Sequence, residues 1–270
     1  MRRAPLRPTR LAGAWAAALG AAALGVAACA DAPTGADPFS LAFDRLPFPA
    51  VVAGDTLRDT SGVAAPLRAV VFGGDGAEIP DAPVSYLIID RGAHLVDSVY
   101  AFGDSLGATV RVVAEAAGIP SQPLNLAVVL RPDSLSLTTT APDTARYSPR
   151  ILISPADTSQ RIEVRVLHRP AQGDAIGVGS WVVRYDVELY DGATPVPNDS
   201  LALLVGENSQ LSVLDTTDAQ GAAWRKLLLN GARPAIDAVD SAVVSVTILG
   251  RPAGTVSPKS VRVAVPVRIR

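Results

Sequence analysis

The sequence is poor in cysteine, histidine and aromatic residues. Its single cysteine cannot form an intramolecular disulfide, and its two histidines offer few ligands for a metal site. Aromatic residues make up 5% of the 270 positions, so a core must be built mainly from aliphatic side chains. The 22 glycines and 22 prolines are spread along the chain and indicate many turns. This composition predicts an all-β protein with short strands.

An excess of basic side chains is also lacking. The chain has 24 basic and 26 acidic side chains, and four of its arginines lie within the first ten residues. Without those four, 20 basic side chains face 26 acidic ones, so nothing attracts the protein electrostatically to nucleic acid or to an anionic bilayer surface. We therefore expect no nucleic-acid partner.

The first 29 residues have the pattern of an export signal. Four arginines are followed by residues 11–28, which carry no charge and consist almost entirely of alanine, leucine, glycine and valine. A membrane-spanning helix is the alternative, although roughly 18 apolar residues is short for one. Residues Val26, Ala27, Ala28 and Cys29 resemble the lipobox of bacterial lipoproteins. This resemblance predicts a lipoprotein signal peptide over residues 1–28.

The lipoprotein resemblance implies that Cys29 begins the mature chain and carries fatty acids such as palmitate. Such acyl chains anchor a protein stably because each buried methylene contributes about 0.8 kcal/mol. Ala30 stands where enteric lipoproteins of the inner membrane have an aspartate, so the resemblance favours the outer membrane of the cell envelope, on either face. A signal peptide cleaved nearby without lipidation is the alternative. Residues 29–38 are small, polar and proline-bearing and are expected to form a flexible tether.

Alternating apolar and polar side chains mark strands that bury one face. Six runs show this alternation clearly, and turns separate them: residues 108–116, 124–130, 161–166, 181–189, 242–248 and 261–269. The first two runs are typical of a closing hairpin. Pro266 has no N–H for a ladder, so we expect the last strand to lie at a sheet edge. Short strands at this spacing favour β-sandwiches.

The two halves of the chain are related in sequence. The strands and turns from Val84 to Glu115 correspond to the segment from Leu201 to Leu227. Residues 217–223, Thr-Asp-Ala-Gln-Gly-Ala-Ala, resemble the "T-D-x-x-G-x-A" turn of bacterial immunoglobulin-like domains, including those of invasin and intimin type. In that family the turn reverses the chain between strands of opposite sheets. Repeat and resemblance together predict two tandem immunoglobulin-like β-sandwich domains, over residues 39–131 and 132–270.

Residues 101–107 match the opening block of the GDSL hydrolases, whose serine attacks ester carbonyls. Ser105 would need a histidine base within hydrogen-bonding reach and an acid to orient that base. Neither His94 nor His168 has an aspartate three residues before it, as the family pattern requires, and the glycine-bearing oxyanion block is missing. We therefore predict an ordinary turn and no catalytic residues.

We expect no metal site and no cofactor. His94 and His168 stand far apart in the sequence without a second nitrogen or thiolate ligand beside either. Asp215 and Asp218 are candidates for calcium, but they lack an Asp-x-Asp-x-Asp frame, so a solvated turn is the favoured interpretation. Trp181 and Trp224 lie in strand patterns, and we expect both to be core side chains.

These patterns favour a non-enzymatic, lipid-anchored envelope protein whose immunoglobulin-like modules serve adhesion, protein or glycan binding, or spacing. Its expected partners are the membrane, through the lipid, and an unidentified protein or glycan. Such modules bind through loops or strand edges. A structural envelope accessory without a ligand is the alternative, and a GDSL-type esterase is the third hypothesis.

Overall fold

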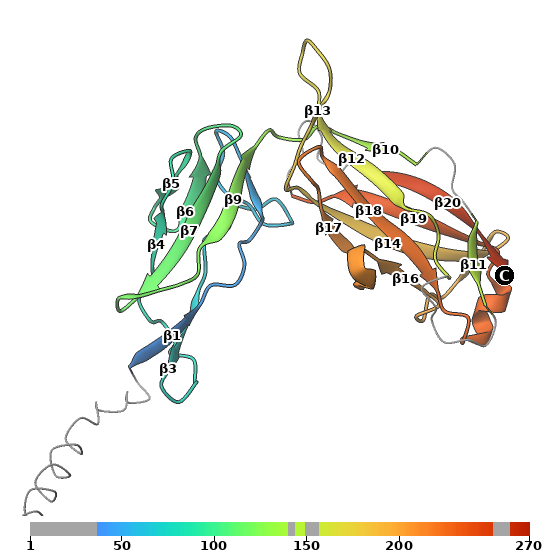
Figure 1. Cartoon of the computed structure of the whole chain (residues 1–270), viewed down its shortest axis with the longest axis horizontal. Helices are drawn as coiled ribbons and strands as arrows, with labels where there is room; N and C mark the ends of the chain where they lie inside the picture. The colour runs from blue at the N-terminus through green and yellow to red at the C-terminus, as the bar shows by residue number, and fades with distance from the viewer. Residues whose placement is uncertain (1–36, 140–143, 149–156, 251–259) are drawn as a thin grey trace, which may run out of the picture.

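The computed structural model describes residues 37–139, 144–148, 157–250 and 260–270, which fold mainly as strands and turns (Figure 1). The predicted signal peptide, Cys29 and the tether up to residue 36 lie outside the described residues. The described part has two short 3-10 helices, η1 (Glu207–Ser209) and η2 (Pro234–Ala238), and no α-helix. The all-β prediction is therefore confirmed. None of the described residues lies in a helix with the length and hydropathy needed to cross a bilayer.

The N-terminal half contains the first nine described strands. They are β1 (Pro38–Ala42), β2 (Ala50–Val52), β3 (Val70–Gly73), β4 (Ser85–Ile88), β5 (Ala93–Val96), β6 (Tyr100–Gly103), β7 (Thr109–Ala116), β8 (Ile119–Pro120) and β9 (Leu124–Val129). One sheet has the order β2-β9-β7-β4, with β8 also paired to β7. Two antiparallel pairs, β1–β3 and β5–β6, complete this half. β1 begins at Pro38, which is inside the range predicted for the tether.

The C-terminal half contains the remaining described strands. They are β10 (Ser134–Leu137), β11 (Ala145–Tyr147), β12 (Ile162–His168), β13 (Ile176–Gly177), β14 (Val182–Asp191), β15 (Thr194–Val196), β16 (Ala202–Val205), β17 (Leu214–Thr216), β18 (Ala222–Leu229), β19 (Ser241–Ile248) and β20 (Ser260–Ile269). One sheet has the order β10-β12-β18-β16, with β13 paired to β12. The other has the order β11-β20-β19-β14-β15, with β17 paired to β14.

The six predicted strand runs are confirmed as β7, β9, β12, β14, β19 and β20. β19 shows the cause most clearly, because its alternate residues Ala242, Val244, Val246 and Ile248 are all fully buried. The predicted closing hairpin is also confirmed: β7 pairs antiparallel with β8 and then with β9.

Facing side chains of the two C-terminal sheets fill one core, so this half is a β-sandwich. Val164 and Val166 of β12 are fully buried on one sheet, and Tyr185 of β14 and Val244 of β19 are fully buried on the other. Figure 1 shows the two layers, with β12 and β18 in one and β14 and β19 in the other. The predicted sandwich architecture is thus confirmed in this half.

The two halves share one strand order. In each half a short strand lies parallel to the last strand, followed by two antiparallel neighbours: β2-β9-β7-β4 in the first and β11-β20-β19-β14 in the second. The remaining antiparallel pairs also match, with β1–β3 corresponding to β10–β12 and β5–β6 to β16–β18. A shared order of this kind is what a repeated module would produce.

The sequence-based alignment of the two halves is nevertheless out of step. It set the strand after Val84 against the strand after Leu201, which are β4 and β16. β4 belongs to the sheet that contains the last strand of its half, whereas β16 belongs to the opposite sheet. The error arises because every strand here alternates with the same period, so a pattern of strands and glycine turns does not reveal the sheet.

The expectation that the last strand lies at a sheet edge is wrong for its final residues. β11 pairs in parallel with β20 from Ala145 opposite Val267 to Tyr147 opposite Ile269. The other side of β20 pairs with β19. Pro266 lies directly before the residues that β11 covers, so its missing N–H does not prevent this pairing.

A small aromatic contact joins the two halves. The Phe48 and Trp181 rings pack edge to face with 5.0 Å between their centroids, and each side chain is only 3% exposed. The Trp181 indole N–H donates a hydrogen bond to the Leu249 carbonyl at 2.9 Å. The next N–H, of Gly250, donates to the Thr60 carbonyl of the N-terminal half at 2.8 Å. Trp181 is therefore a buried side chain, as predicted, but the core it completes spans both halves.

The connection between the halves is held from both sides. The Arg131 guanidinium donates to the Asp55 carboxylate of the N-terminal half. The Arg131 carbonyl lies 2.9 Å from Nδ1 of His168 in β12, and a carbonyl can only accept this hydrogen bond. The Asp133 N–H donates to the Leu167 carbonyl, also of β12, at 2.9 Å. We call these contacts and the Phe48–Trp181 pair the junction.

Asp55 is ionised within this junction. Burial opposes its ionisation, but hydrogen bonds from Arg58, from the Thr56 amide and from Arg131 outweigh burial and lower the pKa of the carboxyl. The Arg58 guanidinium reaches the two carboxylate oxygens at 3.0 and 3.2 Å. Asp55 therefore holds two cations, one of which belongs to the connection between the halves.

Two tyrosines are buried in the C-terminal core, and their hydroxyls differ in hydrogen bonding. Tyr147 and Tyr185 are 1% and 0% exposed. The Tyr147 hydroxyl donates to Asp237 at 2.9 Å, and burial together with this carboxylate raises the pKa of Tyr147 to about 12. The Tyr185 hydroxyl has no hydrogen-bond partner among the described residues.

We predict opposite outcomes for the same change at these two positions. Tyr147→Phe should lower the free energy of unfolding by about 1 kcal/mol, because it removes a hydrogen bond to a charged group and leaves Asp237 without it. Tyr185→Phe should leave the stability unchanged or raise it, because the lost hydroxyl is unpaired. Urea unfolding of the fragment from Asp37 onward measures both. Equal losses at both positions would contradict the prediction.

Candidate functional site

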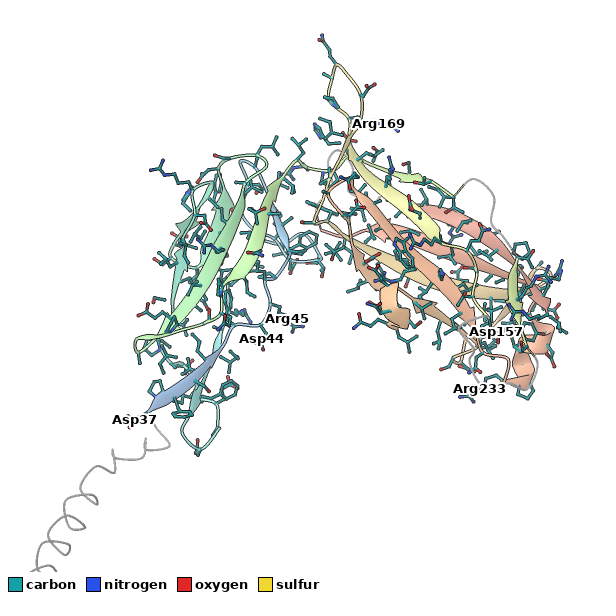
Figure 2. The ribbon with its side chains drawn as sticks, in the orientation of Figure 1. Asp37, Asp44, Arg45, Asp157, Arg169 and Arg233 are labelled. Atoms are coloured by element: carbon teal, nitrogen blue, oxygen red, sulfur yellow. The ribbon has the colours of Figure 1, made fainter. Side chains whose placement is uncertain are left out.

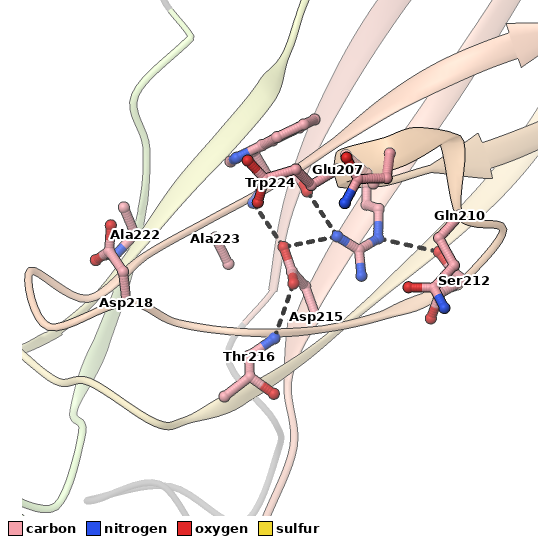
Figure 3. A pocket seen from close by; sticks show the side chains of 12 residues that line it. Glu207, Gln210, Ser212, Asp215, Thr216, Asp218, Ala222, Ala223 and Trp224 are labelled. Atoms are coloured by element: carbon pink, nitrogen blue, oxygen red, sulfur yellow. Dashed lines mark hydrogen bonds and ion pairs between the residues drawn. The ribbon is translucent and has the colours of Figure 1, made fainter.

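Two neighbouring surface hollows lie on either side of Trp224 in the C-terminal half. Their volumes are about 480 and 520 Å³. Gly206, Glu207 and Asn208 line both hollows together with Trp224. We call the pair of hollows the Trp224 surface; Figure 3 shows the first of them. The first is lined mainly by β17, β18 and the turn between them, and the second by β16, β18 and η1.

Arg225 forms the base of the first hollow and points into the sandwich. It is only 8% exposed and occupies an inward position of β18 between the buried Ala223 and Leu227. Its guanidinium lies 2.8 Å from the Asp215 carboxylate. It also donates to three backbone carbonyls, those of Ser212, Leu214 and Trp224. This single cation therefore ties the segment that crosses between the two sheets to β18.

Asp215 is the counterion of Arg225 and is held by the backbone as well. Its carboxylate accepts hydrogen bonds from the N–H groups of Thr216 and Trp224, each at 2.9 Å (Figure 3). Tyr185 of β14 belongs to the same sheet as Asp215, and β14 pairs with β17. Burial, followed by the negative charge of Asp215, raises the pKa of Tyr185, so the phenol stays protonated at neutral pH.

Trp224 lies on the outer face of its sheet, so the prediction that it is a core side chain is wrong. In β18 its fully or nearly fully buried neighbours in sequence, Ala223 and Arg225, face inward, and Trp224 is only partly buried. The Arg161 guanidinium lies 4.0 Å from the centroid of the Trp224 ring. This cation–π contact holds the indole in place.

The rim of the Trp224 surface is a short irregular segment. Asn208 and Ser209 adopt the left-handed backbone conformation, with φ of 57° and 59°. Such positions cost of order 1–3 kcal/mol for residues with a side chain and are found more often at binding sites. The Gly206 N–H donates to the Gln210 carbonyl at 2.9 Å and closes the segment, and the Ser212 N–H donates to the Leu204 carbonyl of β16 at 3.2 Å.

The turn at residues 217–221 connects strands of opposite sheets, as the resemblance to bacterial immunoglobulin-like domains implies. β17 before it pairs with β14, and β18 after it pairs with β12 and β16. Asp218 accepts hydrogen bonds from the N–H groups of Gln220 and Ala222 at 2.9 Å, and Gly221 adopts φ of +78°. The Thr217 hydroxyl is buried and donates to the Val178 carbonyl.

The two aspartates that were weighed as calcium ligands have other partners. Asp215 is paired with Arg225, and Asp218 accepts the turn amides. Within the described ranges, no three His, Cys, Asp or Glu side chains come together as a metal-binding group.

The GDSL-like segment forms a turn between β6 and β7. The amides of Asp104 and Ser105 both donate to the Gly92 carbonyl. His94 lies 2.9 Å from the Asp104 carboxylate, and His168 contacts the Arg131 carbonyl. In the described part of the chain, neither histidine is thus hydrogen-bonded to the Ser105 hydroxyl, as a serine nucleophile would require.

Sequence reasoning missed Arg225 and the Asp55–Arg131 pair. A signal for Arg225 was present, because a charged residue on the buried face of an alternating strand needs a partner inside the protein. No comparable signal marks Asp55 and Arg131, which lie in separate loops. The predicted lipidation residues, Val26 to Cys29, lie outside the described residues.

No protein-family model and no curated protein matches the sequence. Among solved structures, the chain is similar to the adhesin InvE of Yersinia pseudotuberculosis, with 13% identity and a TM-score of 0.34 over 81% of this chain and 56% of the adhesin. It is also similar to domains 5-6 of the S-layer protein SbsC, with 14% identity and a TM-score of 0.28 over 86% of this chain and 97% of that one. A third is a family 2 glycosyl hydrolase from Bacteroides cellulosilyticus, with 11% identity and a TM-score of 0.28 over 73% of this chain and 24% of the hydrolase. The chain thus spans little more than half of the adhesin.

The contribution of the Arg225–Asp215 ion pair to the free energy of unfolding can be measured. Arg225→Met should lower the free energy of unfolding by about 2–3 kcal/mol, because it leaves the Asp215 carboxylate, whose side chain is 21% exposed, and three backbone carbonyls without their donor. The double variant Arg225→Met/Asp215→Asn should lose less than the sum of the two single losses. Urea unfolding measures the cycle.

The exposed pair Arg184–Asp186 is the matched control, since both side chains are about half exposed at a similar distance. Arg184→Met and Asp186→Asn should each cost less than about 1 kcal/mol. Two results would contradict a stabilising Arg225–Asp215 pair: strictly additive losses in its double-variant cycle, or losses at Arg184 and Asp186 as large as those at Arg225 and Asp215.

Proposed function

We propose that this chain is a lipid-anchored protein of the cell envelope that binds a protein or glycan partner through the Trp224 surface. The observation that carries the binding role is this pair of adjoining hollows, which combines an aromatic ring with polar groups on a rigid sheet. It lies on strands and a fixed rim, where binding groups keep their positions.

The anchor rests on the sequence. Cys29 is the single cysteine, it follows an uncharged apolar run directly, and small residues precede it. Ala30 in place of aspartate favours the outer membrane as the site of attachment. Asp37, where the described chain begins, lies at the end of the N-terminal half that points away from the C-terminal half (Figure 2). An anchored chain would therefore carry the Trp224 surface beyond the N-terminal half.

The junction supports a fixed spacing between membrane and binding surface. The connection between the halves is short and is held by contacts to both, and the Phe48–Trp181 pair is buried. These contacts also favour a second candidate function, a spacer without a ligand. The two candidates differ only in whether the Trp224 surface is used.

The lipid anchor predicts a modification at one residue. Cells that express the full chain with a palmitate analogue should label the wild type, and Cys29→Ser should abolish the label and release the protein from the membrane fraction. Ser105→Cys in the Cys29→Ser background is the control for nonspecific thiol labelling, and it should stay unlabelled. An unlabelled wild type that is nevertheless exported would overturn the anchor and leave the secreted alternative.

The junction predicts a fixed distance between the halves. Trp181→Ala or Phe48→Ala should increase the radius of gyration from small-angle X-ray scattering, because the halves lose their shared contact. Phe39→Ala removes an aromatic ring that is 59% exposed on β1 and should leave the radius unchanged. The same junction depends on pH through Asp55, whose pKa is lowered. The stabilisation of the folded chain by ionised Asp55 is fully present above the ordinary pKa of 3.8 and is lost as the pH falls through the lowered pKa. Unchanged scattering in both junction variants would exclude a rigid junction.

A further inference from the structure

We propose that the Trp224 surface binds a neutral oligosaccharide. This inference rests on the binding role proposed above and names the chemical class of its ligand. Three features of the surface carry it: an apolar floor with an aromatic ring, hydrogen-bonding side chains without partners, and a balance of charges.

The floor is made by outward side chains of two strands, β16 and β18. Trp224 of β18 and Leu203 of β16 are partly exposed, whereas Val205 and Leu228 are only 4% and 6% exposed; all four line the second hollow. Leu211, which is 60% exposed, borders the same hollow. A sugar ring carries C–H groups on its faces, and these pack against an aromatic ring and aliphatic side chains as other apolar groups do.

The rim supplies hydrogen-bonding groups of the kind that hydroxyls need. The side chains of Glu207, Asn208 and Gln210 line the first hollow, and none of them forms a hydrogen bond with another described residue. An amide side chain both donates and accepts, and a carboxylate accepts. A sugar hydroxyl does both, so these groups can pair with several hydroxyls of one ring.

The charges of the surface favour an uncharged ligand. Arg161 and Lys226 contribute two positive charges, whereas Glu207 and Asp218 contribute two negative ones. The remaining two ionised side chains at the surface, Asp215 and Arg225, neutralise each other. Without an excess of either sign, the surface does not attract a polyanion or a basic peptide.

The surface is also prepared before binding. Arg161 stacks on Trp224, and Arg225 holds the backbone at Ser212 and Leu214. Groups that are already ordered lose little conformational entropy when a ligand binds.

The test is a titration of the full mature chain, purified in detergent, with cellohexaose, maltohexaose, mannohexaose and chitohexaose. Polygalacturonate serves as the anionic probe, and an unstructured neutral peptide serves as the protein probe. Calorimetry should detect millimolar or tighter binding of at least one neutral hexasaccharide. Trp224→Ala should weaken that binding at least about tenfold.

Two variants separate binding from folding. Gln210→Ala removes a side chain without a described hydrogen-bond partner and should weaken binding while the melting temperature stays unchanged. Phe39→Ala, an exposed aromatic residue outside the surface, should leave the affinity unchanged. If Trp224→Ala unfolds the chain, the affinity of Gln210→Ala still shows whether the ligand binds at the Trp224 surface.

Several outcomes would overturn the inference. They are no binding of any neutral hexasaccharide at millimolar concentration, binding that Gln210→Ala and a folded Trp224→Ala both leave unchanged, and binding of polygalacturonate or peptide alone. Binding of the peptide alone, lost in Trp224→Ala, would keep the proposed binding role and reject only the glycan. Palmitate labelling of Cys29 reports on the anchor independently of all these results.

Discussion

The C-terminal sandwich depends on one buried cation. Arg225 sits where an aliphatic side chain would continue the core, and its guanidinium pairs with Asp215, with the Ser212 and Leu214 carbonyls of the segment between the sheets, and with the Trp224 carbonyl of β18. A charge at this depth is tolerated only when its hydrogen bonds are complete, so the crossing segment has a single position that the core accepts. Because Arg225 lines the first hollow and holds the backbone at Ser212 and Leu214, it also fixes part of the wall of that hollow.

A charged pair also holds the segment that connects the two halves. Asp55 holds Arg131 of the connecting segment, and the backbone of that segment is bonded to β12. The buried Phe48–Trp181 pair belongs to one hydrophobic cluster that includes residues of both halves. The chain is rich in aliphatic residues, and its single cysteine cannot form an intramolecular disulfide. Two of its few aromatic side chains, Phe48 and Trp181, lie in the contact between the halves.

Features that depend on neighbouring residues in the sequence were predicted correctly, and features that depend on distant residues were not. Alternation located β7, β9, β12, β14, β19 and β20, because the side-chain period of two is a local property of a strand. Strand patterns also placed Trp224 in the core and aligned β4 with β16, and the missing N–H of Pro266 indicated an unpaired edge at the end of β20; each of these predictions was wrong. Which face is buried and which strand lies beside another depend on residues far away in the sequence, and a local period is identical in every case.

The sequence by itself determined the all-β class and the positions of six strands, because these follow from side-chain periodicity. The glycine turn at residues 217–221 was also visible in the sequence, while its crossing between opposite sheets was implied by the resemblance to bacterial immunoglobulin-like domains. The sequence also carries the prediction of lipidation at Cys29. Only the tertiary structure decided that Trp224 faces outward beside Arg161, that Arg225 is buried, and that Phe48 meets Trp181. The reason is that each of these contacts joins different strands or different halves, and only the packing of the sheets brings their side chains together.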